Sequence, residues 1–185
     1  MISAVTAPGT HSPDNRPAVE RWLLSAHSEP EQARGEWGEN GVVLLPLGAR
    51  FSAVRIPREL VMSAARLEES KDYLVDVMLD EFLGETLNEG PVIFDQHRQR
   101  YYMLVPGSTP IRWHKAAASW RTLGVDCLGL DTYLGVPRLN ANRGYPEHWS
   151  SYWAVPMRSP GALCNVIDVA RLIAAGKRNL AEVAE

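Results

Sequence analysis

The spacing of hydrophobic and polar positions changes near Gly90. Upstream of this glycine, apolar residues recur at helical spacing in three stretches, as expected for helices that bury one face, and Ser28 with Glu31 forms a capping-box pattern that opens another helix. The pattern predicts helices that begin near Pro17, Ser28, Pro57 and Ser70. The Asn40-Gly41 pair is expected to end the second helix and Gly84 the fourth.

Two short apolar runs interrupt this helical part of the chain. Residues 42–45 are continuously apolar, which predicts a buried central strand, and residues 51–56 predict a second strand. Downstream of Gly90, residues 91–95 and 100–105 predict a β-hairpin that turns at residues 96–99.

The remaining sequence alternates between strand-like and polar segments. Residues 107–123 fit no single element, although several apolar positions share a helix face. Residues 124–136 predict a strand, a turn and a strand, followed by a polar loop over 137–150. A last strand is expected at 151–155. Asn165 should then cap a helix that Gly176 ends.

The element order predicts an α+β domain with a mostly antiparallel or mixed sheet flanked by helices. The 185 residues, 45% of them hydrophobic, suffice for one packed core. We expect a disordered N-terminal segment at 1–16, a single domain at 17–178 and a C-terminal tail at 179–185.

Neither secretion nor membrane insertion is indicated. The N-terminus lacks a charged region followed by an apolar one, and no apolar run approaches the roughly 18 residues of a spanning helix. Cys127 and Cys164 follow no metal-ligand spacing and predict reduced, buried thiols. These features predict a cytoplasmic protein without a membrane partner, a metal site or a cofactor.

Charge is distributed unevenly along the chain. The net charge is -3, yet residues 1–95 carry sixteen acids and eight bases, whereas 96–146 carry two acids and seven bases. Such asymmetry fits either a surface for an anionic partner or attraction between two parts of one fold.

Three segments together resemble a known family. They are 41–47 (GVVLLPL), 100–106 (RYYMLVP) and 124–137 (GVDCLGLDTYLGVP), the last of which follows the pattern GVDxxGxxxYxxxP without gaps. In this order they are similar to the N-terminal domain of bifunctional DNA primase/polymerases. The resemblance implies a primase-polymerase-like domain.

The resemblance also implies where chemistry would lie. Family members hold two Mg²⁺ or Mn²⁺ ions with a pair of carboxylates and a third carboxylate, whose position here is Asp126. The family's phosphate-binding histidine is replaced by Tyr101. The carboxylate pair has no counterpart in residues 51–56, and Asp76 falls in a helical pattern typical of a solvated residue. One carboxylate does not hold two hard cations, so no polymerase activity is expected.

The leading hypothesis is a non-catalytic binding or accessory module on a degenerate primase-polymerase scaffold. Its partner would be a nucleotide, a single-stranded nucleic acid or a protein. One alternative is residual nucleotidyl transfer through Asp126, Asp131 and Asp76, the only case that requires Mg²⁺ or Mn²⁺; another is a small-molecule sensor. The candidate ligand-binding residues are Arg98, Arg100, Tyr101, Tyr102, Arg112, Trp113, Lys115 and Asp126.

Overall fold

The computed structural model describes residues 14–68, 72–143 and 150–183. The first half of the chain forms α1 (Arg16–Leu24), α2 (Pro30–Asn40), β1 (Val42–Pro46), β2 (Phe51–Pro57), α3 (Arg58–Ala64) and α4 (Tyr73–Thr86). The second half forms β3 (Val92–Asp95), β4 (Arg100–Pro106), α5 (Thr109–Arg112), α6 (His114–Trp120), a 3-10 turn (Arg121–Leu123), β5 (Asp126–Leu128), β6 (Tyr133–Pro137), β7 (Ser151–Val155) and α7 (Val166–Val183).

The strands form two antiparallel sheets. The larger has the order β5-β2-β4-β3-β7, and the smaller pairs β1 with β6. The predicted hairpin is confirmed, because β3 and β4 pair with each other and residues 96–99 connect them. The predicted α+β class with largely antiparallel pairing is therefore confirmed.

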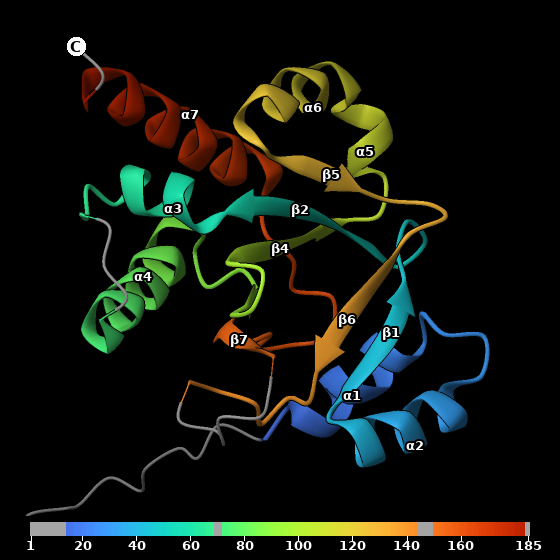
Figure 1. Ribbon diagram of the computed structural model, residues 1–185. Helices are drawn as coiled ribbons and strands as arrows, with labels where there is room; N and C mark the ends of the chain where they lie inside the picture. The colour runs from blue at the N-terminus through green and yellow to red at the C-terminus, as the bar shows by residue number, and fades with distance from the viewer. Residues whose placement is uncertain (1–13, 69–71, 144–149, 184–185) are drawn as a thin grey trace, which may run out of the picture.

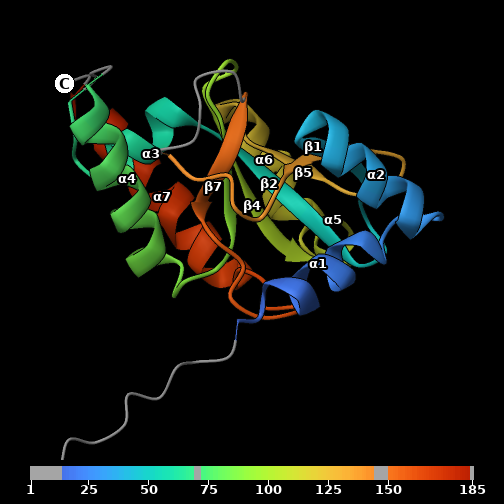
Figure 2. The same cartoon turned by 90° about the horizontal axis from the view of Figure 1, so that it is seen from below.

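The larger sheet lies between two hydrophobic layers (Figure 1 and Figure 2). Helices α3, α4 and α7 cover one face, together with α6, and pack on alternate strand residues such as Val54, Tyr101 and Met103. The opposite face packs through Ala53 and Leu104 against α1, α2 and the inner side of the smaller sheet. Successive side chains of a strand point to opposite faces of the sheet, so each face contributes residues to its own hydrophobic core.

The prediction of a buried central strand at residues 42–45 is wrong. Among the described strands, β1 pairs only with β6. Its side chains alternate, with Val43 and Leu45 buried and Leu44 60% exposed. A continuous apolar run is compatible with either arrangement. Here the apolar outer residue faces a cleft rather than a second buried layer.

The strand-turn-strand prediction for residues 124–136 is confirmed for the strands, but the two do not pair with each other. β5 pairs with β2 in the larger sheet, whereas β6 pairs with β1 in the smaller one. The turn at 129–132 therefore carries the chain from one sheet to the other. This crossing sets the two sheets at an angle around a cleft.

Two predicted helix ends are wrong. α4 continues past Gly84 to Thr86, and α7 continues past Gly176 to Val183, through residues where a tail was expected. Gly176 instead allows close packing, because a Cβ atom built there would lie 2.5 Å from the Leu60 carbonyl oxygen.

Two predictions at helix starts fall partly outside the described residues. Ser70 is not described, and α4 is capped by Asp72, whose carboxylate accepts a hydrogen bond from the Leu74 N–H at 3.1 Å. Residues 1–13 of the expected disordered segment are also not described, but Arg16 already belongs to α1. None of the helices in the described ranges is both long and apolar enough to cross a membrane.

Candidate functional site

A cleft of about 260 Å³ lies between the two sheets. One wall is a polar part of the larger-sheet face that also carries Ala53 and Leu104, with Arg55, Tyr102 and Asp95, and the other is the outer side of β1 and β6. Arg98, from the turn between β3 and β4, lines one part of it. Asp95 shapes this turn by accepting the Arg98 backbone N–H at 3.0 Å.

The polar wall contains an ion pair between adjacent strands. β5, β2 and β4 place Asp126, Arg55 and Tyr102 in one row across the sheet. Arg55 donates to Asp126 Oδ2 from Nη2 at 2.6 Å and from Nε at 3.2 Å. This hydrogen bond raises the pKa of Arg55 above its usual value. The Asp126 charge is thus balanced by a neighbour on the same face.

The opposite wall is apolar and unusually open. Tyr133 and Leu44 line it with side chains 65% and 60% exposed. Gly135 lies opposite Leu44 in the strand pairing, and because it has no side chain this wall projects less into the cleft there. An exposed tyrosine ring beside a guanidinium group suits a flat, partly charged ligand.

A second cavity, of about 600 Å³, lies on the other side of the same hairpin turn. Arg58, His97, Arg98 and Arg100 line it, together with Asp76 and Glu59. Arg98 therefore borders both cavities. Within the described part of the chain, the guanidinium groups of Arg98 and Arg100 make no ion pair. These two cations can bind an anion without displacing a carboxylate.

The candidate residues do not form one surface. Arg98, Tyr102 and Asp126 lie at or beside the cleft, and Arg100 lies in the neighbouring cavity. Tyr101 is fully buried on the opposite face of the sheet, where its ring stacks on Phe94 at 4.3 Å between centroids. Burial raises the pKa of the Tyr101 hydroxyl. Tyr101 is therefore out of reach of any ligand in the cleft.

The other three candidates lie on the α5–α6 segment. Arg112 and Lys115 are exposed there, whereas Trp113 is half-buried and stacks on Trp120 with centroids 6.3 Å apart. Neither Arg112 nor Lys115 lines the cleft or the hairpin cavity. The basic character of residues 96–146 is thus divided between separate surfaces.

The prediction that Asp76 is a solvated helix residue is wrong. Its side chain is 24% exposed and pairs with Arg58 at 2.7 Å and with Arg143 at 3.2 Å. Asp80, one turn along α4, pairs with Arg143 as well, at 2.5 Å. This network fastens α4 to α3 and to the segment that follows β6, on the face opposite Asp126.

Burial favours the protonated form of Asp80 in this network. Removal from water raises the pKa of Asp80 to about 7, against the opposing effect of Arg143. Among the described side chains, Asp80 Oδ1 and the hydroxyl groups of Tyr101 and Tyr152 are buried without a hydrogen-bond partner. The Arg143 guanidinium also lies 4.9 Å from the Tyr152 ring centroid.

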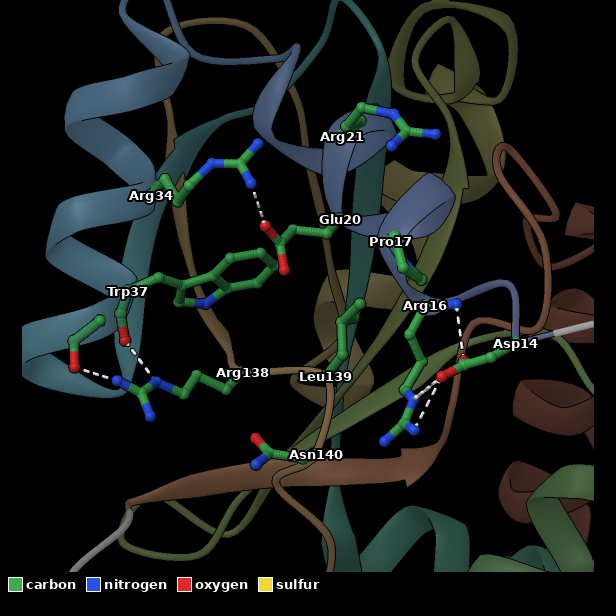
Figure 3. A pocket seen from close by; sticks show the side chains of 11 residues that line it. Asp14, Arg16, Pro17, Glu20, Arg21, Arg34, Trp37, Arg138, Leu139 and Asn140 are labelled. Carbon is green, nitrogen blue, oxygen red and sulfur yellow. Dashed lines mark hydrogen bonds and ion pairs between the residues drawn. The ribbon is translucent and has the colours of Figure 1, made fainter.

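A further pocket, of about 550 Å³, lies at the junction of α1, α2 and the end of β6, and ion pairs form among the residues that line it (Figure 3). Arg34 pairs with Glu20 at 2.8 Å, and Arg16 pairs with Asp14. Arg138 donates to the carbonyl groups of Trp37 and Gly38 at the end of α2. These contacts indicate a structural role.

The acidic residues considered for a metal site remain apart. Asp126 and Asp76 lie on opposite faces of the sheet, and Asp131 is exposed on the turn before β6. Within the described ranges, no group of three or more His, Cys, Asp or Glu side chains is arranged to hold a metal ion.

The sequence interpretation did not identify Arg55, Tyr133 or Leu44 as site residues. A charged residue within the apolar run 51–56 was the available signal for Arg55. Tyr133 and Leu44 carried no such signal, because their exposure depends on how the two sheets meet. Comparison of the chain with protein-family models, curated protein sequences and solved structures finds no match.

Proposed function

We propose that this protein is a non-catalytic binding module that holds a nucleotide, or the end of a single-stranded nucleic acid, between its two sheets. The base would enter the cleft and lie against the exposed Tyr133 ring. The phosphates would be bound by Arg98 and Arg100, since guanidinium groups bind phosphate oxygens in a bidentate manner.

The size of the cleft supports this division of the ligand. Its volume of about 260 Å³ is below the roughly 300–1,000 Å³ typical of small-molecule pockets. A base fits such a space, but its phosphates must lie outside. The proposal rests chiefly on Arg98, which borders both the cleft and the larger cavity that also contains Arg100.

The carboxylates support a role without metal-dependent catalysis. Two-metal nucleotidyl transfer needs carboxylates gathered on one site, whereas Asp126 pairs with Arg55 and Asp76 pairs with two arginines elsewhere. The motifs similar to primase-polymerases fit a scaffold of that origin that has kept a ligand cleft without the metal-binding set.

Titration of the full chain with mononucleotides and a short fluorescent oligothymidylate, in EDTA, tests the proposal. Base stacking on an aromatic side chain contributes about 1–3 kcal/mol, so Tyr133→Ala should weaken binding at least about fivefold. Tyr73→Ala is the matched control, because Tyr73 is similarly exposed at 60% but lies on α4. Absence of binding by the wild type, or equal losses in both variants, contradicts the proposal. Binding that is absent in EDTA and appears only in a second titration with Mg²⁺ or Mn²⁺ favours residual nucleotidyl transfer instead.

A further inference from the structure

A groove of about 570 Å³ lies among three loops on the side of β5, formed by residues 48–49, 107–111 and 127–132. Its loops are held together by glycines. A Cβ atom on Gly107 would lie 2.7 Å from the Gly48 carbonyl oxygen, and one on Gly129 would lie 2.6 Å from the Pro110 ring. Glycine at these two positions therefore allows the three loops to approach one another closely.

The groove presents apolar side chains to solvent. Ile111 and Leu130 are 70% and 66% exposed, the highest values among the large hydrophobic residues described, and both line the groove. Isolated exposed apolar residues are common, but two that border one concave surface are typical of an interaction site.

Three exposed basic residues lie close in sequence to the residues that line this groove. Arg50 follows Ala49 of the groove wall, Arg112 follows Ile111, and Lys115 lies one turn further on α6; all three are exposed. In the part of the chain that the structure describes, none of these side chains makes an ion pair. Asp131, beside Leu130, is the nearby acid in sequence. The exposed sequence neighbours of the groove therefore carry an excess of positive charge.

We propose that this groove docks a short acidic segment of a partner protein, with two apolar side chains seated on Ile111 and Leu130. Acidic residues flanking them would face Arg50, Arg112 and Lys115, so that charge complementarity selects the partner. A nucleic acid is the less suitable occupant, because none of the described residues that line the groove carries an aromatic ring on which a base could stack. The inference does not depend on the nucleotide cleft.

Selection of random displayed peptides on the full chain tests this proposal. The selected peptides should combine acidic residues with a pair of apolar ones. They should bind Leu130→Ser and Arg112→Glu at least tenfold more weakly than the wild type. The controls are Ile167→Ser and Lys177→Glu on α7, where Ile167 is 49% exposed; these should bind normally.

Three outcomes overturn the proposal. Selected peptides that are not enriched in acidic residues would show that charge does not select the partner. Equal losses of affinity in the groove and control variants would show that the peptides do not bind in the groove. In the third outcome no binding peptide is selected, oligothymidylate binds the wild type, and Arg112→Glu abolishes that binding. This result would assign the surface to nucleic acid.

Discussion

Arg55 Nη2 lies 2.6 Å from Asp126 Oδ2, across neighbouring strands of the larger sheet. Asp126 is the carboxylate of the GVD motif, the residue that the resemblance to primase-polymerases would make a metal ligand. In this fold its negative charge is engaged by a guanidinium group that belongs to the same row of the sheet. Arg55 lines the cleft, and its pairing with Asp126 balances the carboxylate beside it.

Replacing Asp126 should strengthen anion binding. Asp126→Asn removes the counter-charge of Arg55 and makes the cleft more positive, so affinity for an anionic nucleotide should rise about threefold, whereas the loss of a half-exposed ion pair should cost at most about 1 kcal/mol of unfolding free energy. Isothermal titration and urea denaturation measure the two effects. Asp131→Asn, an exposed acid outside the cleft, is the control. Loss of binding in Asp126→Asn would indicate that the carboxylate itself holds the ligand or a metal.

Asp80 should make stability depend on pH in an identifiable window. Its pKa is raised from 3.8 to about 7, so the folded protein binds more protons than the unfolded chain between these values. Its contribution to the free energy of unfolding is therefore greatest below about pH 4 and is lost as pH rises through about 7. Urea denaturation should show the wild type losing stability relative to Asp80→Asn across this interval. A difference that is constant with pH, or grows in favour of the wild type, contradicts the assignment.

Two helical glycines should respond oppositely to alanine. Gly35 in α2 has no atom within 4 Å of an added Cβ, so Gly35→Ala should stabilise the protein by about 0.5–1 kcal/mol. Gly176→Ala should destabilise it by about 2 kcal/mol or more, because the new methyl group meets the Leu60 carbonyl. Thermal and urea denaturation of both variants check the close packing of α7 on α3. Equal stabilisation by both substitutions would show that this packing is looser.

Arg138 should matter for folding and not for ligand binding. Arg138→Met removes hydrogen bonds to the Trp37 and Gly38 carbonyl groups at the end of α2, which should cost about 1–3 kcal/mol (Figure 3). Arg21→Met is the control, since Arg21 lines the same pocket but is exposed. It should change stability by less than about 0.5 kcal/mol. A change in nucleotide affinity in Arg138→Met, without a loss of stability, would instead assign this pocket to the ligand.

Local sequence pattern was sufficient for most of the elements. Alternation and turn residues predicted the β3–β4 hairpin, β2 and β7, and helical spacing predicted α1 and α3. It failed where long-range packing decides. The glycine at position 176 suggests a helix end, but in the fold it allows close contact with Leu60. Residues 42–45 suggest a central strand, but among the strands that the structure describes they pair with β6 alone.

The candidate site was less accessible to sequence reasoning. Two-residue alternation placed Tyr101 and Tyr102 on opposite faces of a strand, but it did not indicate which face borders the cleft. Arg55 comes into contact with Asp126 through the pairing of strands 71 residues apart in sequence. The exposure of Tyr133 depends on the crossing of the chain between sheets, which no local pattern specifies.

The most direct test of the account compares two pairs of charge removals. Arg98→Ala/Arg100→Ala removes the unpaired cations beside the cleft, and Lys177→Ala/Arg178→Ala removes two exposed cations of α7. Oligothymidylate binding is measured by anisotropy in EDTA over a range of salt concentrations. We expect the first variant to bind at least tenfold more weakly than the wild type. The slope of log affinity against log salt concentration should also be shallower by about one to two. The second variant should bind like the wild type. Equal affinities of the two double variants would contradict it.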